Sequence, residues 1–163
     1  MTPPPFRLTV AALALLAVFA SPAMAGEKAP LPRFAALRSN EVNLRTGPGT
    51  QYPVEWVFLR RALPVEIVAE YGQWRKVRDV DGSEGWVHRS LLTGKRWAMI
   101  TGGVRTLRRE PDETSPPVLR AEPGVLGKLL ACQGAWCRLE IEGRKGWLPR
   151  REVWGVYAGE AIK

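Results

Sequence analysis

Histidine and cysteine are scarce in this sequence, whose 163 residues include one histidine, His88, and two cysteines, Cys132 and Cys137. Structural zinc sites draw four ligands mainly from these two residue types, so we expect no metal site. A cysteine–histidine catalytic pair is also disfavoured, because the histidine and the cysteines lie in different halves of the chain. The sequence therefore predicts no catalytic residues, no metal and no cofactor.

Helical patterning is missing beyond residue 25, because proline and glycine recur too often for a long amphipathic run. A glycine-rich phosphate loop is missing too, since Thr46-Gly47-Pro48-Gly49 precedes neither a helix nor a lysine. The carboxylates Asp79, Asp81 and Glu84 gather at one turn, as solvated acidic residues commonly do. A carboxylate pair of the glycosidase type stays open as a minor alternative. The main expectation is a protein that is not an enzyme.

The one long apolar run lies at the N-terminus, over residues 8–20, after Arg7 and before Ala23-Met24-Ala25. A positive residue, a short apolar run and small residues at the end are typical of a secretory signal peptide. The run is too short to span a bilayer as a stable helix. We predict a signal peptide over 1–25, a short segment over 26–33, and a periplasmic or secreted chain without a transmembrane segment.

Positive charge is in excess, since 24 lysines and arginines against 16 aspartates and glutamates give a formal charge of +8. Such a chain attracts anionic surfaces and polymers, although the same excess can simply keep a protein soluble. Nucleic acid is a common partner of basic proteins inside the cell. Export makes it an unexpected partner here, so we predict no nucleic-acid binding.

An internal repeat is the strongest pattern in the sequence. Matching residues recur at an offset of 63 positions, then 62, then 61, and the drops fall where a duplicated domain tolerates length changes. The matches include Leu44-Arg45 with Leu107-Arg108, Pro48 with Pro111, Gly72 with Gly134, Trp74 with Trp136, Gly85-Trp86 with Gly146-Trp147, Arg89 with Arg150, and Gly94 with Gly155. We therefore expect two copies of one domain, over 34–94 and 97–157, and a C-terminal tail over 158–163.

Each repeat has the pattern of short strands joined by tight turns. In the first, Val65–Ala69 is rich in β-branched residues, Trp74–Arg78 alternates in polarity, and Asp81-Gly82 is a hairpin signal. Short strands at this density predict an all-β fold made of two small barrels.

The motifs of the first repeat resemble those of the bacterial SH3 domain (SH3b-like) family. The resemblance rests on Val42-Asn43-Leu44-Arg45-Thr46-Gly47-Pro48-Gly49, Trp74-Arg75-Lys76-Val77 and Gly85-Trp86-Val87-His88. It implies two tandem SH3-like β-barrels after a cleaved signal peptide, as in two-domain proteins of proteobacterial type. The resemblance says much less about function than about fold.

The second repeat departs from this pattern at its start. Leu107-Arg108-Arg109-Glu110-Pro111 lacks the glycines of the first repeat, so we expect its first loop to differ in shape. It keeps Trp136-Cys137-Arg138-Leu139 and Gly146-Trp147-Leu148.

Tryptophan is plentiful, and all seven tryptophans lie beyond the predicted signal peptide. A small barrel can bury only one or two, so several should offer exposed faces to peptides or sugars. For the first repeat we predict a ligand groove that uses Arg45, Tyr52, Trp56, Arg60, Arg61, Trp74 and Arg75. Packing in the core or between the domains is the alternative for Trp74.

The remaining tryptophans divide by position. We favour core or inter-domain packing for Trp86 and Trp147, which begin strands after a turn glycine, and leave Trp136 open. We place Trp154 and Tyr157 at a barrel end or between the barrels.

The two cysteines are predicted to form a disulfide across a hairpin. Four residues separate Cys132 from Cys137, and a tight turn brings such flanking positions within bridging distance. The equivalent residues of the first repeat, Glu70 and Arg75, form a complementary ionic pair. Two reduced thiols, with Cys137 on the strand face of Leu139, are the alternative.

Two classes of function stay open. The first is an exported binding module that recognises cell-wall (peptidoglycan) peptide or glycan, or an envelope protein segment, through an aromatic groove. The second is a structural or accessory subunit that docks proteins in an envelope complex and binds no small ligand. Exposed aromatic residues beside arginine would favour the first, and tryptophans buried between the barrels would favour the second.

Overall fold

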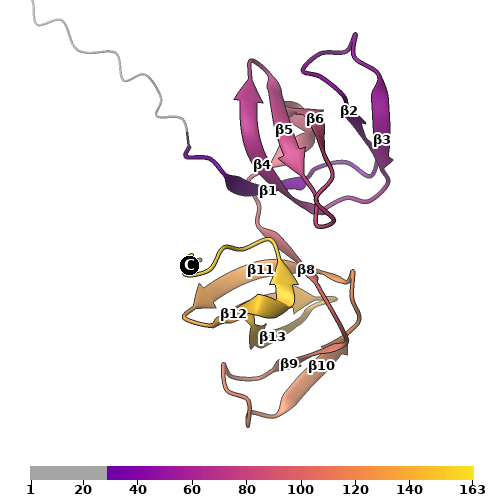
Figure 1. Cartoon of the computed structure of the whole chain (residues 1–163). Coiled ribbons are helices and arrows are strands. Elements are labelled where there is room, and N and C mark those ends of the chain that lie inside the picture. Colours follow the sequence, from indigo (N-terminus) through magenta and orange to yellow (C-terminus); the bar gives the residue numbers. More distant parts are fainter. Residues whose placement is uncertain (1–28) are drawn as a thin grey trace, which may run out of the picture.

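The computed structural model describes residues 29–163, so the predicted signal peptide and its cleavage site lie outside the described residues. The described chain forms two all-β barrels, one above the other and joined by the short linker 94–96 (Figure 1). This arrangement confirms the predicted fold class.

The first barrel is a seven-stranded antiparallel sheet with the strand order β3-β2-β6-β5-β4-β1-β7. Its elements are β1 (Arg33–Leu37), β2 (Val42–Arg45), β3 (Val54–Phe58), β4 (Pro64–Tyr71), β5 (Trp74–Arg78), β6 (Glu84–His88), the 3-10 turn η1 (Arg89–Leu91) and β7 (Leu92–Thr93). Inward residues of β2, β4, β5 and β6 close the core, which contains Val42, Leu44, Val65, Ile67, Val77 and Val87.

The second barrel repeats this plan with the order β10-β9-β13-β12-β11-β8-β14. Its elements are β8 (Trp97–Ile100), β9 (Arg105–Arg108), β10 (Pro117–Ala121), β11 (Leu126–Gln133), β12 (Trp136–Ile141), β13 (Arg144–Pro149), η2 (Arg150–Glu152) and β14 (Val153–Trp154). Burial alternates along β12, so Cys137, Leu139 and Ile141 face the core. Trp147 is buried, as expected, whereas Trp86 is half-buried.

The first loop of the second barrel keeps the hydrogen-bond pattern of its counterpart, which corrects our expectation of a different shape. The amide of Thr46 donates to the Pro53 carbonyl at 3.1 Å, and the amide of Arg109 donates to the Pro116 carbonyl at 3.0 Å. The pairs are equivalent by the repeat offset of 63.

Side-chain caps hold this second loop where the first uses glycines. The Ser115 hydroxyl accepts from the Glu110 amide at 2.9 Å, and the Asp112 carboxylate accepts from the Thr114 amide at 2.8 Å. The latter bond holds the pKa of Asp112 below its usual range. Short polar side chains stabilise turns in this way, so the second loop keeps this hydrogen-bond pattern without the glycines.

The barrels contact each other through aromatic residues. The Tyr157 hydroxyl donates to the Glu66 carboxylate at 2.8 Å, and the Trp154 indole donates to the Pro64 carbonyl at 3.2 Å. The Phe34 ring lies 5.0 Å from the Trp154 ring and 4.7 Å from the Tyr157 ring. Burial and the bond to Glu66 raise the pKa of Tyr157 above its usual range. Of the two places predicted for Trp154 and Tyr157, a barrel end or the space between the barrels, the structure shows the second.

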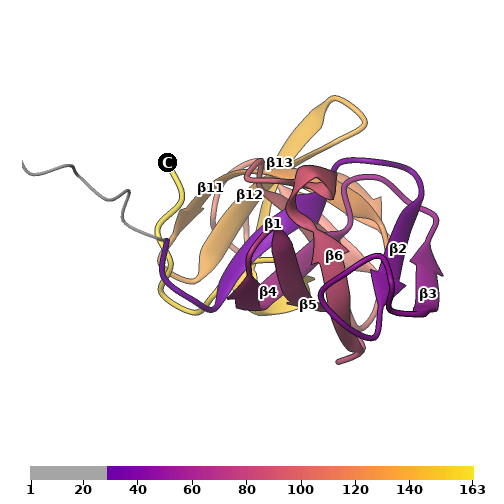
Figure 2. The same ribbon diagram turned by 90° about the horizontal axis from the view of Figure 1, so that it is seen from above.

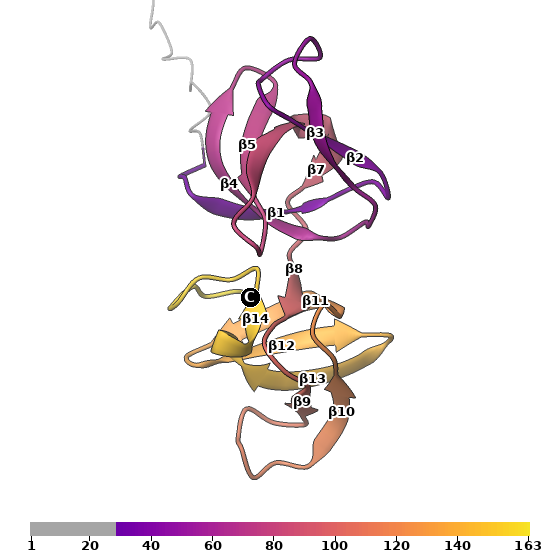
Figure 3. The ribbon, with the colours of Figure 1, turned by 45° about the vertical axis from the view of Figure 1, so that its right-hand side comes forward.

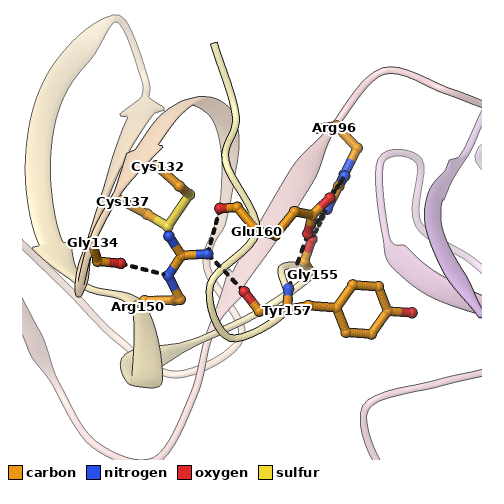
Figure 4. Close-up of a disulfide and its surroundings, with 8 residues drawn as sticks. All are labelled: Arg96, Cys132, Gly134, Cys137, Arg150, Gly155, Tyr157 and Glu160. Atoms are coloured by element: carbon orange, nitrogen blue, oxygen red, sulfur yellow. Dashed lines mark hydrogen bonds and ion pairs between the residues drawn. A yellow bond between two sulfur atoms is a disulfide. The ribbon is translucent and has the colours of Figure 1, made fainter.

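The segment after β14 packs back onto the second barrel. Cys132 and Cys137 form a disulfide with a Cα–Cα distance of 4.1 Å, as predicted, and Ile162 bridges to Cys132. Figure 4 shows Arg150 beside this disulfide, with its guanidinium bonded to the carbonyls of Tyr157 and Glu160.

A second arginine ties the same segment to the linker. Arg96 donates to the Gly155 carbonyl at 2.7 Å and to the Glu160 carboxylate at 3.1 Å (Figure 4). Burial acts to raise the pKa of Glu160, but the bonds from Arg96 and the Tyr157 amide lower it below its usual range. Linker, β14 and C-terminal segment thus fix one barrel against the other.

Candidate functional site

A groove of about 660 Å³ lies on the side of the first barrel that faces the second. Its floor is apolar, and its rim combines one tryptophan with acidic side chains. The lining residues are Leu44, Glu55, Trp56, Phe58, Leu63, Pro64, Val65, Asp79, Val80, Asp81, Ser83, Glu84 and, from the second barrel, Met99. The turn between β5 and β6 reaches towards β8 and forms one wall (Figure 3).

Strand β3 forms the opposite wall and is unusually exposed. It ends the strand order of its sheet, and Figure 2 shows β2 and β3 side by side away from the C-terminus. Trp56 is 61% exposed, and its neighbours Val54, Val57 and Leu59 are also exposed. An edge strand with open apolar side chains can accept an extended peptide, which adds main-chain hydrogen bonds to side-chain contacts.

The acidic rim is only partly neutralised by the first barrel itself. Glu84 pairs with Lys76 at 2.7 Å and with Arg78 at 2.8 Å, and these cations lower the pKa of the Glu84 carboxyl. The Asp79 carboxylate accepts backbone N–H bonds from Asp81 and Ser83. These bonds shape the turn but bring no counter-charge.

Two rim carboxylates have no such partners. Within residues 29–163, the carboxylates of Glu55 and Asp81 make no hydrogen bond or ion pair. No lysine or arginine lines the groove. The local charge is therefore negative, although the whole chain carries +8.

Arg45 was predicted as a ligand contact, but its guanidinium braces a loop. It donates to the Tyr52 carbonyl at 2.8 Å and the Thr50 carbonyl at 3.2 Å. Its counterpart Arg108 donates to the Ser115 carbonyl at 2.8 Å in the second barrel. The same brace at both repeat positions indicates a structural role in the loop.

The other aromatic residues of the predicted groove lie elsewhere. The Tyr52 ring is 40% exposed and lies against Gly47, where a Cβ would be 2.4 Å from the ring. Trp74 is half-buried and packs edge-on against His88 at 5.4 Å. Neither residue lines the groove, whose aromatic side chains are the exposed Trp56 and the buried Phe58.

Arg75 lies in a different hollow, of about 570 Å³, which Arg33, Arg89 and Arg96 share. Arg75 pairs with Glu70 at 3.0 Å, as the repeat comparison predicts, and donates to the carbonyls of Gly72 and Trp74. Arg33 also bonds Glu70. Carboxylates of the protein thus engage much of the positive charge here.

The Arg60-Arg61 pair does not act as one site. Arg60 donates to the Gly124 carbonyl of the second barrel at 2.8 Å and so links the two domains. Arg61 is exposed and has no hydrogen bond or ion pair within the part of the chain that the structure describes. Neither lines the groove beside Trp56.

The second barrel supplies an internal comparison for the groove. Leu44 faces Trp56 across β2 and β3, and Leu107 faces Leu119 across β9 and β10, so Leu119 occupies the position of Trp56. The corresponding hollow, of about 500 Å³, is lined by Arg120 and Arg144 with Glu122 and Glu142. Of these two equivalent hollows, the one in the first barrel therefore combines an exposed tryptophan with a net negative charge.

Sequence reasoning missed the acidic side of the groove. The cluster of Asp79, Asp81 and Glu84 was visible and was interpreted as a solvated turn. Glu55 is more than twenty positions away in the chain, and only the fold brings it to the same groove. The one signal in the sequence was that this longer turn is replaced by Gly143 in the second repeat.

The fold and the site together define a class of module. It is a small antiparallel barrel with an open edge strand and an aromatic groove. Residues 38–94 and 104–155 each match the bacterial SH3 domain family. The chain belongs to this family, with two domains in tandem, and the predicted resemblance is confirmed.

One curated relative is a protein of Bacillus subtilis (strain 168) named "Putative N-acetylmuramoyl-L-alanine amidase YrvJ". It is 25% identical over 134 residues, which cover 73% of this chain and 25% of the relative. The chain thus spans about a quarter of the length of this relative.

Similar solved structures include an NlpC/P60 family protein from Bacillus cereus ATCC 10987, with a TM-score of 0.34 and 17% identity over 80% of this chain and 58% of that one. NlpC2 from Trichomonas vaginalis has a TM-score of 0.35 and 12% identity over 76% of this chain and 48% of that one.

Two features are absent from residues 29–163. No helix there is long and apolar enough to cross a membrane. No group of three or more histidine, cysteine, aspartate or glutamate side chains there is placed to hold a metal ion.

Proposed function

We propose that this protein is an exported, non-catalytic binding module that recognises cell-wall peptide through the groove beside Trp56. The observation that carries the proposal is a tryptophan 61% exposed on an edge strand, above an apolar hollow of about 660 Å³. Exposed aromatic faces of this kind are costly to leave in water and are typical of recognition surfaces.

Two further findings support the proposal. The disulfide Cys132–Cys137 is the kind of bond that persists outside the cytoplasm, which fits a periplasmic or secreted protein. Curated and solved relatives carry the names of an amidase and of NlpC/P60 proteins, so cell-wall peptide is a sensible ligand class. A tandem module that holds such a ligand needs no catalytic residues of its own.

Replacing Trp56 with alanine should weaken binding to purified peptidoglycan by about tenfold, because stacking on one aromatic face contributes about 1 to 1.5 kcal/mol. Co-sedimentation of the chain from residue 26 with purified peptidoglycan measures this. Tyr71→Ala is the matched control, since Tyr71 is 66% exposed at the end of β4 and does not line the groove.

The control should sediment as the parent does, and no soluble fragments should appear during the incubation. Equal sedimentation of Trp56→Ala and the parent would refute the groove as the site. Release of fragments would show catalysis and so refute the proposal of a non-catalytic module. Failure of the parent to sediment would favour docking to an envelope protein instead.

A further inference from the structure

We propose that the groove beside Trp56 selects a primary amine, so that its ligand is a peptide segment with a lysine-type side chain. This inference rests on the proposed function and specifies which chemical group of the ligand the groove holds. It reverses the sign of the charge that the arginine-rich sequence had suggested for the ligand.

The first step concerns the charge of the groove. Four carboxylates line it, from Glu55, Asp79, Asp81 and Glu84, with no basic residue among the lining side chains. Glu84 has its own cations in Lys76 and Arg78. The other three carboxylates have none, so an incoming cation gains attraction that the protein itself does not supply.

The second step concerns the shape of the ligand. A lysine-type side chain is an apolar stem that ends in a compact ammonium with three donors. The floor of the groove offers Phe58, Leu63 and Met99 to the stem, and the rim offers carboxylate oxygens to the ammonium. Long cationic side chains bind in this way, with the stem on apolar surface and the charge near water.

The third step concerns Trp56. Its ring is open to solvent on the wall opposite the β5–β6 turn, which carries Asp79 and Asp81. An ammonium near an indole face gains a cation–π attraction, which is largest for tryptophan. A ring and carboxylates around one hollow favour a cation over a neutral or anionic group.

The second barrel shows that this combination is not a by-product of the fold. Its equivalent hollow has Leu119 in place of Trp56, and its two arginines balance its two glutamates. The same architecture in the same chain therefore lacks both features that the amine needs. Only the first barrel should discriminate between amine and amide.

The test uses two capped peptides, acetyl-alanyl-lysyl-alanine amide and the same peptide with its lysine amine acetylated. Each is titrated into the 15N-labelled chain from residue 26, and the indole signal of Trp56 is followed, assigned by its absence in Trp56→Phe. The amine peptide should shift this signal with an affinity at least about tenfold higher than the acetylated peptide, from the loss of cation–π and ionic contacts.

Charge removal provides the second arm. The double variant Glu55→Gln/Asp81→Asn should bind the amine peptide about three- to tenfold more weakly than the parent, since each exposed ion pair contributes little by itself. The control Glu41→Gln/Glu122→Gln makes the same change in net charge at exposed positions outside the groove. It should bind within about twofold of the parent, because distant surface charges are screened.

The inference is overturned if both peptides shift Trp56 equally, if neither shifts it, or if the groove and control variants weaken binding alike. These outcomes are separate from the sedimentation result. Peptidoglycan that binds equally well before and after acetylation of its amines would retain the proposed function and refute amine selection. Peptidoglycan that does not bind at all would refute the proposed function, while the two peptides still decide the amine question.

Discussion

Replacing Gly155 with alanine should destabilise the second barrel by about 3 kcal/mol or more, whereas the same change at Gly94 should have almost no effect. The two glycines are equivalent by the repeat. A Cβ on Gly155 would lie 2.4 Å from the Trp97 carbonyl oxygen and 3.1 Å from the Ala98 Cα, both on rigid backbone. Around Gly94 nothing lies within 4 Å of that atom.

Backbone conformation adds to the steric conflict at this position. Gly155 has a φ of 122°, which side-chain-bearing residues rarely adopt. The backbone must therefore shift, and with it the contacts of Trp154 and Tyr157 to the first barrel. Hydrogen exchange of the amides in β8 and β14 measures the local loss, with Gly94→Ala as the control. Equal protection in the two variants would contradict this account of the junction.

Replacing Arg150 with alanine should lower the free energy of unfolding of the second barrel by about 3 kcal/mol. Arg150 is 8% exposed. Its guanidinium donates to the carbonyls of Gly134 at 3.1 Å, Tyr157 at 2.6 Å and Glu160 at 2.7 Å. Removing it takes one donor from each of these three carbonyls, of which that of Tyr157 keeps the bond from the Glu160 amide, and releases the C-terminal segment from the disulfide hairpin.

Arg89 is the matched control for this variant. It occupies the equivalent position of the first barrel, where its amide bonds the Gln73 carbonyl as the amide of Arg150 bonds the Ala135 carbonyl. Its side chain is exposed. Arg89→Ala should therefore shift the denaturant midpoint only slightly, as surface substitutions do. A similar shift for both variants would show that the bonds of Arg150 contribute little.

The equivalent pairs Gly94 with Gly155 and Arg89 with Arg150 show what the repeat in the sequence could and could not predict. It predicted two barrels, because Gly85-Trp86 and Gly146-Trp147 recur in order, and it predicted the hairpin that places Cys132 beside Cys137. It could not distinguish Gly94 from Gly155, because the crowding at Gly155 comes from the backbone of Trp97 and Ala98 and from a φ of 122°, and the identity of the glycine shows neither. Identical residues take different roles when their surroundings are not repeated.

The candidate site shows a different limit. Trp56 was predicted as a ligand contact because a small barrel cannot bury all of its tryptophans. The structure places it on the rim of a groove. The arginines grouped with it by nearness in sequence point elsewhere, because Arg45 and Arg75 bond backbone carbonyls of their own turns. Partners across a sheet are set by register, which places Glu55 and the β5–β6 turn around the same hollow.

Mapping the contact surface of solubilised peptidoglycan fragments on the 15N-labelled chain tests the central claim most directly. The account predicts that perturbed amide signals come from β3, from the turn 79–83 and from Met99, with the Trp56 indole among the largest shifts. Perturbations confined to the arginine-lined hollow of Arg33 and Arg89, or to the groove of the second barrel, would contradict it.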